Sequence, residues 1–453
     1  MNSAIREITE GKKILILGFG KEGLSTYRAI RASDLSFHVA IADENPKPEI
    51  SISIREDVHI TWHLGPSCYN ELSQYDLIIK SPGVPMRKLN GVSLSKITSQ
   101  TDIFLNLYFR QAIGVTGTKG KSTTATLINH ILKESGRTTV FVGNIGVPPL
   151  DYLGKISKDT IVVMELSAHQ GEIIHHAPHT MVLLNIFQEH LDHFGSFERY
   201  TKAKLNFHNK QIAGDNFIFH DEDNITCQEL IQKPGIAYFP VSIKHATAGT
   251  WFEKDKFHSF IGKEYTILDK HQPLKGMHNK INICAALTAG YLCGLSPEGQ
   301  ASALRNFTPL EHRLEFVDTV AGIDFYNDSI STIPEATIAA IEALKDVATI
   351  IIGGYDRGID YSGLATFLIS SLVKNIILMG KAGDSVYKYL AGHTNSLQQL
   401  ICVETLEIGV SKAFQLTPKG SVCLLSPAAS SYDSYKNFEE RGKHYKKLIR
   451  DKK

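Results

Sequence analysis

Gly114-Val115-Thr116-Gly117-Thr118-Lys119-Gly120-Lys121-Ser122-Thr123 is the stretch that decides the fold. The apolar pair Ala112-Ile113 leads into this glycine-spaced turn, and a helical pattern follows from Ala125 to Leu132. Glycines allow a positive φ, so successive N–H groups can point at an anion, and the following helix contributes its N-terminal dipole. Lys121 supplies a mobile charge, and the Ser122 hydroxyl can ligate Mg²⁺. The stretch therefore predicts a nucleoside triphosphate site, in the shorter Gly-Thr-x-Gly-Lys-Ser-Thr form of the phosphate loop.

The composition is ordinary for a folded protein: 43% of the 453 residues are hydrophobic and 21% are charged. A chain of this length accommodates about three domains. Acidic and basic side chains nearly cancel, at a formal net charge of +1, so no global field favours nucleic acid or a membrane surface. Any anionic ligand must therefore be held by local sites.

The cysteines and the start of the chain indicate the compartment. The six cysteines lie far apart and include no Cys-x-x-Cys pair, which argues against a disulfide framework and against a structural zinc site. Residues Met1 to Lys13 are polar and charged, without the apolar core of a signal peptide, and no apolar run approaches the length of a membrane span. We therefore expect a cytoplasmic protein.

The first of three segments, residues 1–110, opens with a predicted strand from Lys13 to Leu17 and a turn of the form Gly-x-Gly-x-x-Gly, Gly18 to Gly23. A second strand, Phe37 to Ala42, ends at Asp43, about twenty positions after the turn. This pattern is typical of a dinucleotide-binding βαβ unit. NAD, another nucleotide and a nucleotide-sugar fit the geometry equally well, and a turn that only packs a helix is the alternative without a ligand.

The other two segments, residues 111–309 and 310–453, also alternate strands with helices. In the second, strands are predicted at Thr139 to Val142, Thr160 to Leu166 and Thr180 to Phe187; in the third, at Gly322 to Tyr326, Thr349 to Gly353, Asn375 to Met379 and Val422 to Leu425, with a helix at Pro334 to Leu344. This alternation predicts an α/β protein of three domains. A Rossmann-like N-terminal domain precedes a central, P-loop ATPase-like doubly wound sheet and a Rossmann-like C-terminal α/β domain. Ligands of such sheets bind at the carboxyl ends of the strands.

Two of the polar strand ends carry candidate chemistry. Glu165 ends the apolar run from Ile161, where a phosphate-loop enzyme needs an acid to hold Mg²⁺. His190 lies among carboxylates after the strand that begins at Thr180, so the fold delivers it to the same sheet edge as Glu165 and Lys121. A zinc site built from other histidines is disfavoured, because they have no cysteine partners and no matched spacing to a third ligand. These histidines are His169, His175, His176 and His179.

Further motifs follow in order along the chain: Gly117 to Thr123, Glu165 to Ser167, Asn185 to Asp192, Ala203 to Leu205, Met277 to Asn282, Glu311 to Arg313 and Asn327 to Ser329. In order and spacing they resemble the Mur ligases, the ATP-dependent amide-forming enzymes of cytoplasmic peptidoglycan assembly, over essentially the whole chain. The closing stretches Leu424 to Ala428 and Lys436 to Gly442 are similar to those of the branch that adds glutamate.

The resemblance implies that the carboxylate of UDP-N-acetylmuramoyl-L-alanine attacks ATP, and that the amine of glutamate captures the resulting acyl phosphate. Lys121, Glu165, His190 and Lys204 are then the catalytic residues. Two Mg²⁺ ions are expected on Ser122, Glu165, His190 and Lys204, with Lys204 carbamylated by CO₂. An ordinary solvated helix lysine is the alternative for Lys204.

The resemblance also assigns binding residues. ATP would be held by Gly117, Thr118, Lys119, Gly120, Lys121, Ser122, Thr123, Asn279, Asn282, Arg313 and Asp328. The UDP substrate would be held by Gly20, Lys21, Glu22, Asp43, Ser81, Pro82, Gly83, Asn144 and Gln170. Glutamate would be held by Thr332, Arg357, Ser431 and Phe438. Arg313 and Asp328 come from beyond the central domain, so domain closure would complete the site. We expect a monomer without nucleic acid or membrane partners.

The sequence departs from the family pattern mainly around the predicted glutamate pocket. Ile330 and Arg357 each replace a lysine, His169 replaces an aromatic residue, and Tyr432 replaces a leucine. Arginine can bind a carboxylate bidentately where lysine cannot. Glutamate is still the expected substrate. The overall match to the family motifs favours its D enantiomer, and these departures keep L-glutamate as an alternative.

Three other functions remain as alternatives. A nicotinamide-dependent oxidoreductase would explain the turn Gly18 to Gly23 but not the second phosphate loop. A folylpolyglutamate synthase-like ligase would share the ATP motifs without needing a nucleotide-binding domain before residue 111. A non-catalytic ATP-gated binding protein is disfavoured, because Lys121, Glu165, His190 and Lys204 are all present.

Overall fold

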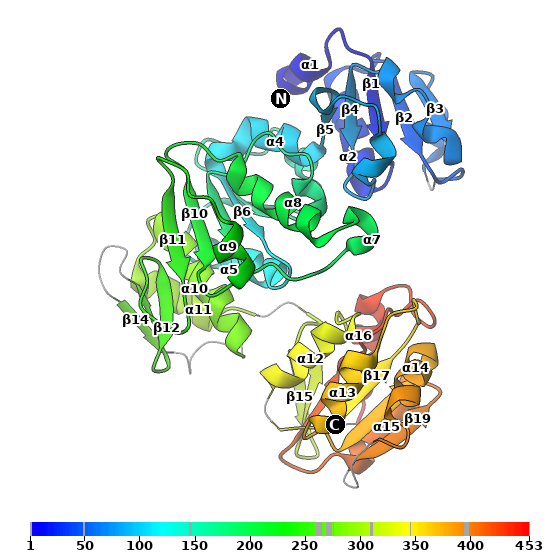
Figure 1. The fold of residues 1–453 in the computed structure, drawn as a ribbon, viewed down its shortest axis with the longest axis vertical. Helices are drawn as coiled ribbons and strands as arrows, with labels where there is room; N and C mark the ends of the chain where they lie inside the picture. The colour runs from blue at the N-terminus through cyan, green and yellow to red at the C-terminus, as the bar shows by residue number, and fades with distance from the viewer. Residues whose placement is uncertain are drawn as a thin grey trace. The chain divides into compact units, whose positions relative to one another are not determined.

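The computed structural model describes residues 2–48, 50–144, 147–259, 265–268, 274, 276–308, 311–344, 346–393 and 398–452. The chain forms two compact units, Met1–Gln272 with Asn279–Phe307, and Pro273–His278 with Thr308–Lys453. The described part of the first unit holds a five-stranded, a six-stranded and a three-stranded sheet, and that of the second holds a six-stranded sheet (Figure 1). The predicted α/β class is confirmed.

The N-terminal sheet has the order β3-β2-β1-β4-β5 and is parallel throughout. Its strands are β1 (Ile14–Leu17), β2 (Val39–Asp43), β3 (Ile60–Leu64), β4 (Leu77–Lys80) and β5 (Ile97–Thr98), and its helices are α1 (Asn2–Thr9), α2 (Lys21–Ser33), α3 (Ile52–Arg55) and α4 (Gln100–Tyr108). Ile14 and Ile16 enter one apolar core, and Leu15 and Leu17 enter another. Alternating side chains of a strand point to opposite faces, so both faces of this sheet are buried.

The central sheet has the order β11-β10-β9-β6-β8-β7 and is also parallel. Its strands are β6 (Ala112–Thr116), β7 (Thr139–Gly143), β8 (Ile161–Glu165), β9 (Thr180–Leu183), β10 (Asn216–His220) and β11 (Ala237–Val241). The helices that follow in the chain are α5 (Lys121–Glu134), α6 (Ala168–Gly171), α7 (Leu191–Phe194), α8 (Phe197–Asn209), α9 (Asn224–Glu229), α10 (Met277–Leu292) and α11 (Pro297–Arg305). A small antiparallel sheet contains β12 (Thr250–Glu253), β13 (Lys256–Ser259) and β14 (Tyr265–Leu268).

The N-terminal and central sheets share one apolar core. Ile16 of β1, Phe104 of α4, and Met164 and Leu183 of the central sheet all belong to the same buried cluster. This continuity explains why the first two predicted domains form one compact unit. The predicted domain limits at residues 110 and 309 stay predictions.

One predicted strand is too long. The strand expected from Thr180 to Phe187 ends at Leu183. Beyond it the backbone contacts the end of β6 and the loop that follows: the Leu184 N–H donates to the Thr116 carbonyl (3.1 Å), and the Thr118 N–H donates to the Asn185 carbonyl (2.8 Å). The apolar residues after Leu183 therefore line a loop at the end of the sheet.

The C-terminal sheet has the order β15-β16-β20-β17-β18-β19, in which only the β15–β16 pairing is antiparallel among the described strand pairs. Its strands are β15 (Glu315–Val320), β16 (Ile323–Asn327), β17 (Val347–Gly353), β18 (Asn375–Met379), β19 (Gln399–Val403) and β20 (Val422–Leu425). Its helices are α12 (Pro334–Ala343), α13 (Ser362–Ser370), α14 (Gly380–Leu390), α15 (Leu406–Leu416) and α16 (Phe438–Arg450).

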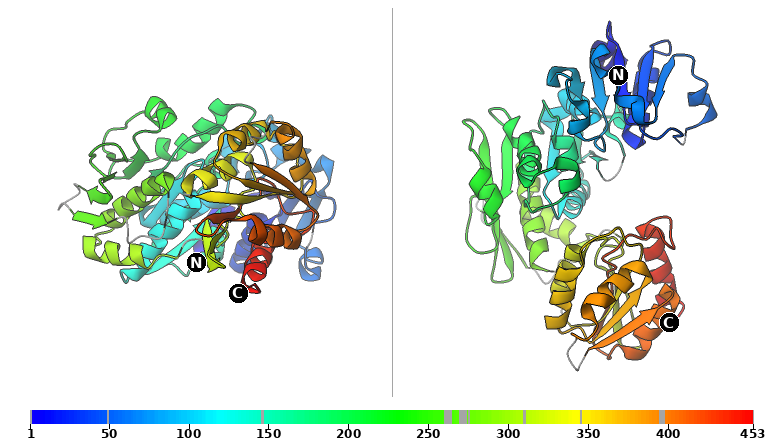
Figure 2. Two further views of the ribbon diagram at one scale, coloured as in Figure 1. Left: turned by 90° about the horizontal axis from the view of Figure 1, so that it is seen from below. Right: turned by 45° about the vertical axis from the view of Figure 1, so that its right-hand side comes forward.

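Helices cover both faces of the C-terminal sheet (Figure 2). Ile350 and Ile352 of β17 lie in a core with residues of α12, α13 and α14, whereas Ile351 between them lies in a core with residues of α15 and α16. This arrangement explains the unbroken apolar run of β17, all of whose residues are buried. Within the residues that the structure describes, no helix is both long enough and apolar enough to cross a membrane.

Gly353, the last residue of β17, offers a test of the C-terminal fold. Its φ is +128°, and a Cβ at this position would collide with the Met379 carbonyl oxygen. We expect Gly353→Ala to lower the free energy of unfolding by roughly 2 kcal/mol or more, because both backbone strain and overlap oppose the added methyl group. Chemical denaturation followed by circular dichroism measures the effect.

Gly363→Ala is the matched control, because a Cβ on this α13 glycine has no heavy atom within 4 Å. It should be neutral or stabilising by about 0.5–1 kcal/mol. Equal denaturation midpoints for the two variants would contradict the packing described for Gly353.

Candidate active site

The register of the central sheet gathers the predicted catalytic segments at one edge. Val115 pairs with Glu165 of β8, and Thr116 pairs with Leu183 of β9. Because these strands are parallel, the phosphate loop, Glu165 and the loop after Leu183 all begin at the same edge.

The phosphate loop is shaped by two glycines and contacts α10. Gly117 has φ +150° and Gly120 has φ +87°, both in the region that favours glycine. A Cβ on Gly120 would overlap the Asn282 amide oxygen, so the α10 side chain lies directly against the loop. Asn282 in turn donates to the Asn279 amide oxygen (2.9 Å). The structure thus brings both predicted ATP-binding asparagines to the phosphate loop.

The loop after β9 forms a second wall of the phosphate loop. The Thr118 N–H donates to the Asn185 carbonyl (2.8 Å), and the Lys119 N–H donates to the Asn185 side-chain oxygen (2.8 Å). The Phe187 N–H donates to the Thr118 hydroxyl (2.9 Å). These bonds hold the backbone of the phosphate loop in place.

Two predicted catalytic lysines converge on one carbonyl of the loop. Lys121 Nζ donates to the Gly117 carbonyl (2.8 Å), and Lys204 Nζ donates to the same oxygen (2.7 Å). Lys204 is 2% exposed, and its burial, with the nearby charge of Lys121, lowers its pKa well below the usual value. Its burial and lowered pKa distinguish Lys204 from a solvated helix lysine, which was the alternative for this residue.

One carboxylate oxygen of Glu165 has no hydrogen-bond partner among the described residues. The residue is 1% exposed, and its Oε1 accepts a hydrogen bond from Asn144 Nδ2 (2.9 Å). Its Oε2 is buried and has no hydrogen-bond partner among the described residues. A buried carboxylate oxygen without a hydrogen-bond donor is a suitable ligand for a cation. Ser122, which is 5% exposed at the start of α5, can supply a hydroxyl as a second ligand. The donor set fits the predicted Mg²⁺.

His190 lies at the same edge, in the left-handed region at φ +55°. Its ring centroid is 4.8 Å from that of His169 and 6.2 Å from that of Tyr200, and its Nε2 is 3.8 Å from Glu189 Oε2. Burial and the neighbouring His193 lower the pKa of His169 to about 3, so this imidazole is neutral at physiological pH. Among the residues that the structure describes, no three His, Cys, Asp or Glu side chains are grouped to hold a metal by themselves.

The predicted UDP-binding turns meet in the N-terminal sheet. The Ser81 hydroxyl donates to the Gly18 carbonyl (2.7 Å), and Ser81 is followed by the predicted contacts Pro82 and Gly83. Asp43 Oδ2 accepts from the Phe19 N–H (2.6 Å). Gly20 precedes α2, and Lys21 begins it. The turn therefore has the strand-to-helix context that its sequence predicts.

Glu22 of α2 joins this turn to α6, the short helix that follows β8 of the central sheet. Gln170 Nε2, at the α6 capping box, donates to Glu22 Oε1 (3.2 Å) and to the Thr101 hydroxyl (3.1 Å). Burial raises the pKa of Glu22 to about 7. Two residues predicted to hold the UDP substrate are thus in contact.

A line of polar residues near Glu22 was not predicted from the sequence. Lys80 Nζ lies 3.4 Å from Glu172 Oε2, and the same oxygen lies 2.9 Å from His193 Nε2. Lys80 is 2% exposed and ends β4. The sequence does contain a signal for this contact, a lysine at the end of an apolar strand, because a buried ammonium group needs a polar or charged partner.

In the C-terminal unit, Asp328 contacts the turn that carries Arg313. Asp328 is 2% exposed; its Oδ1 accepts from the Leu314 N–H (3.1 Å) and its Oδ2 from the Ser426 hydroxyl (2.8 Å). Burial raises the pKa of this carboxyl to about 6. Asp328 is therefore held by protein groups here, and its predicted role at ATP stays a prediction.

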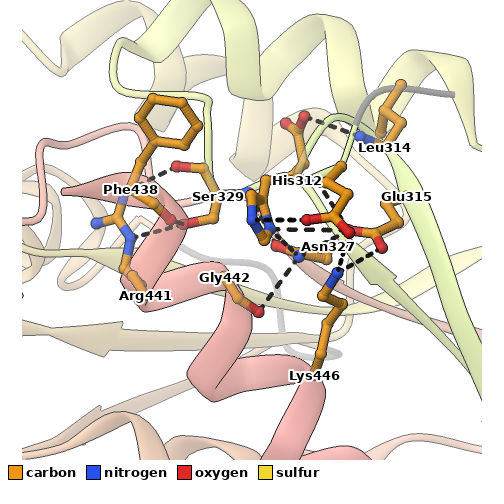
Figure 3. Close-up of polar contacts among 11 residues, drawn as sticks. His312, Leu314, Glu315, Asn327, Ser329, Phe438, Arg441, Gly442 and Lys446 are labelled. Carbon is orange, nitrogen blue, oxygen red and sulfur yellow. Dashed lines mark hydrogen bonds and ion pairs between the residues drawn. The ribbon is translucent and has the colours of Figure 1, made fainter.

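The predicted glutamate residues lie around the carboxyl edge of the C-terminal sheet. Arg357 Nη2 donates to the Thr332 carbonyl (3.1 Å), and the Phe438 carbonyl accepts from the Ser329 hydroxyl (2.8 Å; Figure 3). Ser431 is 2% exposed, whereas Tyr432 beside it is 69% exposed.

Comparison with known proteins shows which family shares this architecture. Family models match residues 115–290 (Mur ligase middle domain) and residues 12–96 (Mur ligase MurD-like, N-terminal domain). The UDP-N-acetylmuramoylalanine--D-glutamate ligase of Koribacter versatilis is 32% identical over 448 residues, which cover 97% of each chain. The ligase of the same name from Citrifermentans bemidjiense is 34% identical over 448 residues, again 97% of each chain. The chain belongs to the Mur ligase family.

A solved Mur ligase shares the fold. MurF from Acinetobacter baumannii matches with a TM-score of 0.64 at 16% identity, covering 100% of this chain and 98% of that one. As a Mur ligase, the protein is an ATP-dependent amide ligase, and the family assignment replaces the oxidoreductase interpretation of the turn Gly18 to Gly23.

Glu22 gives a pH-dependent test of the contact between α2 and α6. Its folded pKa of about 7 exceeds the ordinary 4.5, so the folded state binds the proton more tightly. Stability is therefore lost as the pH rises from 4.5 through 7. We expect Glu22→Gln to raise the melting temperature by a few degrees at pH 8 and to leave it nearly unchanged near pH 4.5, as measured by thermal unfolding.

Glu10→Gln, at an exposed position, is the control and should show no such pH-dependent difference. A constant difference between Glu22→Gln and wild type across the pH range would contradict the buried carboxyl.

Proposed function

We propose that this Mur ligase joins D-glutamate to UDP-N-acetylmuramoyl-L-alanine in peptidoglycan precursor synthesis. The observation that carries the proposal is the full-length similarity to relatives named for this reaction, 32% and 34% identical over 97% of the chain. The convergence of Lys121, Lys204 and Glu165 on one edge of the central sheet supports it. The protein would act as a cytoplasmic monomer without nucleic acid or membrane partners.

The reaction has two steps. A carboxylate oxygen of the UDP substrate attacks the γ-phosphorus of ATP, the bond from that phosphorus to the ADP oxygen breaks, and an acyl phosphate forms. The amine of glutamate then attacks the acyl carbon, forming the C–N bond; the C–O bond breaks, phosphate leaves, and the amine loses a proton. Both steps need charge neutralisation and positioning more than covalent help from the protein.

The residues of the phosphate loop suit the first step. Residues 117–123 would hold the phosphates through the Lys121 ammonium and through N–H groups other than those of Thr118 and Lys119, which donate to Asn185. Asn279 and Asn282 would hold the nucleotide beside them. Arg313 and Asp328, which belong to the C-terminal unit, are the remaining proposed contacts of ATP. Mg²⁺, when bound, neutralises phosphate charge. Ser122 and Glu165 would hold one ion, and His190 and carbamylated Lys204 a second.

Burial supports the carbamylation of Lys204. An unprotonated amine reacts with CO₂ to give a carbamate and a proton, and burial lowers the pKa of this amine. The carbamate would exchange a buried amine for an oxygen ligand.

The two other substrates would bind at the sites described above. Gly20, Lys21 and Glu22 would lie near the pyrophosphate of the UDP substrate and Asp43 toward its uridine. Ser81, Pro82, Gly83, Asn144 and Gln170 would line the muramoyl-alanine path. Arg357 and Thr332 would hold one glutamate carboxylate, with Ser431 and the Phe438 backbone holding the other.

L-glutamate is the second candidate substrate. Ile330 and Arg357 stand where lysines are expected, and an exposed Tyr432 replaces a leucine beside Ser431. These departures cluster at the predicted amino-acid site, where they bear on handedness.

Phosphate release tests the proposal. The protein with ATP, Mg²⁺ and UDP-N-acetylmuramoyl-L-alanine should release phosphate when D-glutamate is added and not when L-glutamate is added. Lys121→Ala should reduce this rate by a factor of about 10²–10³, because a lost transition-state contact costs roughly 3–4 kcal/mol.

Lys133→Ala, an exposed lysine on the same helix, is the control and should keep the wild-type rate. Turnover with L-glutamate alone would reverse the stereochemistry. Phosphate release by folded Lys121→Ala at the wild-type rate would contradict the assigned site.

Carbamylation predicts chemical rescue. Lys204→Ala should be inactive and should regain activity with a short carboxylic acid in the buffer, which can fill the vacated oxygen-ligand position. Lys202→Ala, at a 74% exposed position on the same helix, should behave as wild type with or without the acid. Wild-type activity of Lys204→Ala, or a bare amine in crystals grown with bicarbonate, would contradict the carbamate.

A further inference from the structure

Arg441 is a buried cation with no close carboxylate. It lies in the first turn of α16, and the residue is 1% exposed. Burial lowers its pKa to about 10, so it remains positively charged at neutral pH. None of the ion pairs between described residues includes Arg441; Asp433 acts on it only from beyond ion-pair distance.

The guanidinium instead binds neutral oxygens from three segments. Nε donates to the Ser329 hydroxyl (3.0 Å), and Nη2 donates to the Ser329 carbonyl (2.9 Å) and the Ala429 carbonyl (3.0 Å). Nη1 donates to the Ser430 carbonyl (3.3 Å) and the Gly353 carbonyl (3.4 Å). These segments follow or end β16, β20 and β17, which are parallel neighbours, so Arg441 ties together the carboxyl edge of the sheet.

One of these contacts reaches the Phe438 side of the predicted glutamate pocket. The Ser329 hydroxyl accepts from Arg441 and donates its own proton to the Phe438 carbonyl (2.8 Å; Figure 3). Arg441 therefore fixes the backbone at Phe438 through Ser329.

Another contact orients the opposite side. The Ser430 carbonyl points toward Arg441 and also accepts from the Tyr355 N–H (2.9 Å). A trans peptide group holds its C=O and N–H on opposite sides, so the Ser431 N–H is directed away from Arg441. Arg441 thus sets the direction of a donor at Ser431, the second predicted carboxylate contact.

The electrostatics of this arrangement favour an anion. Burying a cation without a counter-ion is costly, and carbonyl dipoles offset only part of that cost. An anion beyond the oriented peptide groups would interact with their N–H ends and with the guanidinium charge behind them. Glutamate differs from most amino acids in bringing a second carboxylate.

We propose that Arg441 is a positioning residue for the amino-acid substrate. It orients the backbone at Ser431 and Phe438 and places a fixed positive charge behind the site that holds a glutamate carboxylate. This inference rests on the proposed function and deepens it.

Arg441→Lys tests the proposal, because lysine keeps the charge and loses the planar fork that reaches several carbonyls. We expect the KM for glutamate to rise by about ten-fold or more, with the KM values for ATP and the UDP substrate within about two-fold of wild type. Arg450→Lys, the same change at an exposed position of α16, should leave all three KM values unchanged. Arg357→Ala should also raise the KM for glutamate, because Arg357 is proposed to contact a glutamate carboxylate directly.

Ser329→Ala keeps the test decisive if Arg441→Lys does not fold. It removes only the hydroxyl between Arg441 and Phe438, so the KM for glutamate should rise by about three- to ten-fold. The double variant should be no worse than Arg441→Lys, because both changes break one network. An unchanged glutamate KM in folded Ser329→Ala, or equal rises of all three KM values in Arg441→Lys, would overturn the proposal.

The assay separates this inference from the proposed function. Wild-type turnover with L-glutamate alone would contradict the proposed stereochemistry, and the KM comparison would then be made with L-glutamate. Absence of wild-type turnover with either enantiomer would contradict both proposals. Normal turnover with D-glutamate and an unchanged KM in Arg441→Lys would overturn only the role of Arg441.

Discussion

The pairing of Val115 with Glu165 in a parallel register is the constraint on which the active site depends. It places the start of the phosphate loop and the buried carboxylate at the same level of one sheet edge. The pairing of Thr116 with Leu183 adds the loop that carries Asn185. A slip of one residue would turn Glu165 to the other face of the sheet, away from its present neighbours. The register therefore decides whether the phosphate loop and Glu165, the proposed metal ligand, lie at one site.

Features that depend on local sequence could be predicted. The glycines of the phosphate loop, the strand Val422 to Leu425 and the strand Asn375 to Met379 lie where the sequence places them, because turn chemistry and apolar runs are properties of neighbouring residues. Glu165 was a candidate for the same reason, since it ends an apolar run. These local signals, with the rule that neighbouring parallel strands end at the same edge of a sheet, predict most of the candidate site at the edge of the central sheet.

Features that depend on distant contacts could not be predicted. Burial of Lys204 requires α8 to lie against the phosphate loop 87 residues earlier in the chain, and a solvated helix lysine has the same local sequence. The contact of Gln170 with Glu22 spans 148 residues, and that of Arg441 with Ser329 spans 112. The strand from Thr180 was predicted too long because its apolar run continues past Leu183 into a loop. The backbone of that loop is hydrogen-bonded to the phosphate loop, for example from the Thr118 N–H to the Asn185 carbonyl.

Lys204 and Arg441 show how the same burial serves two different chemistries. Both are almost fully buried, and both donate to backbone carbonyls at the edge of a parallel sheet. Burial lowers the pKa of Lys204 well below its usual value, which favours the amine that the proposed carbamylation by CO₂ requires. The guanidinium of Arg441 keeps its charge even at a lowered pKa of about 10. The two proposed roles therefore call for different residues: a lysine amine can accept CO₂ to give the proposed oxygen ligand of Mg²⁺, whereas an arginine keeps the positive charge that the proposed carboxylate site requires.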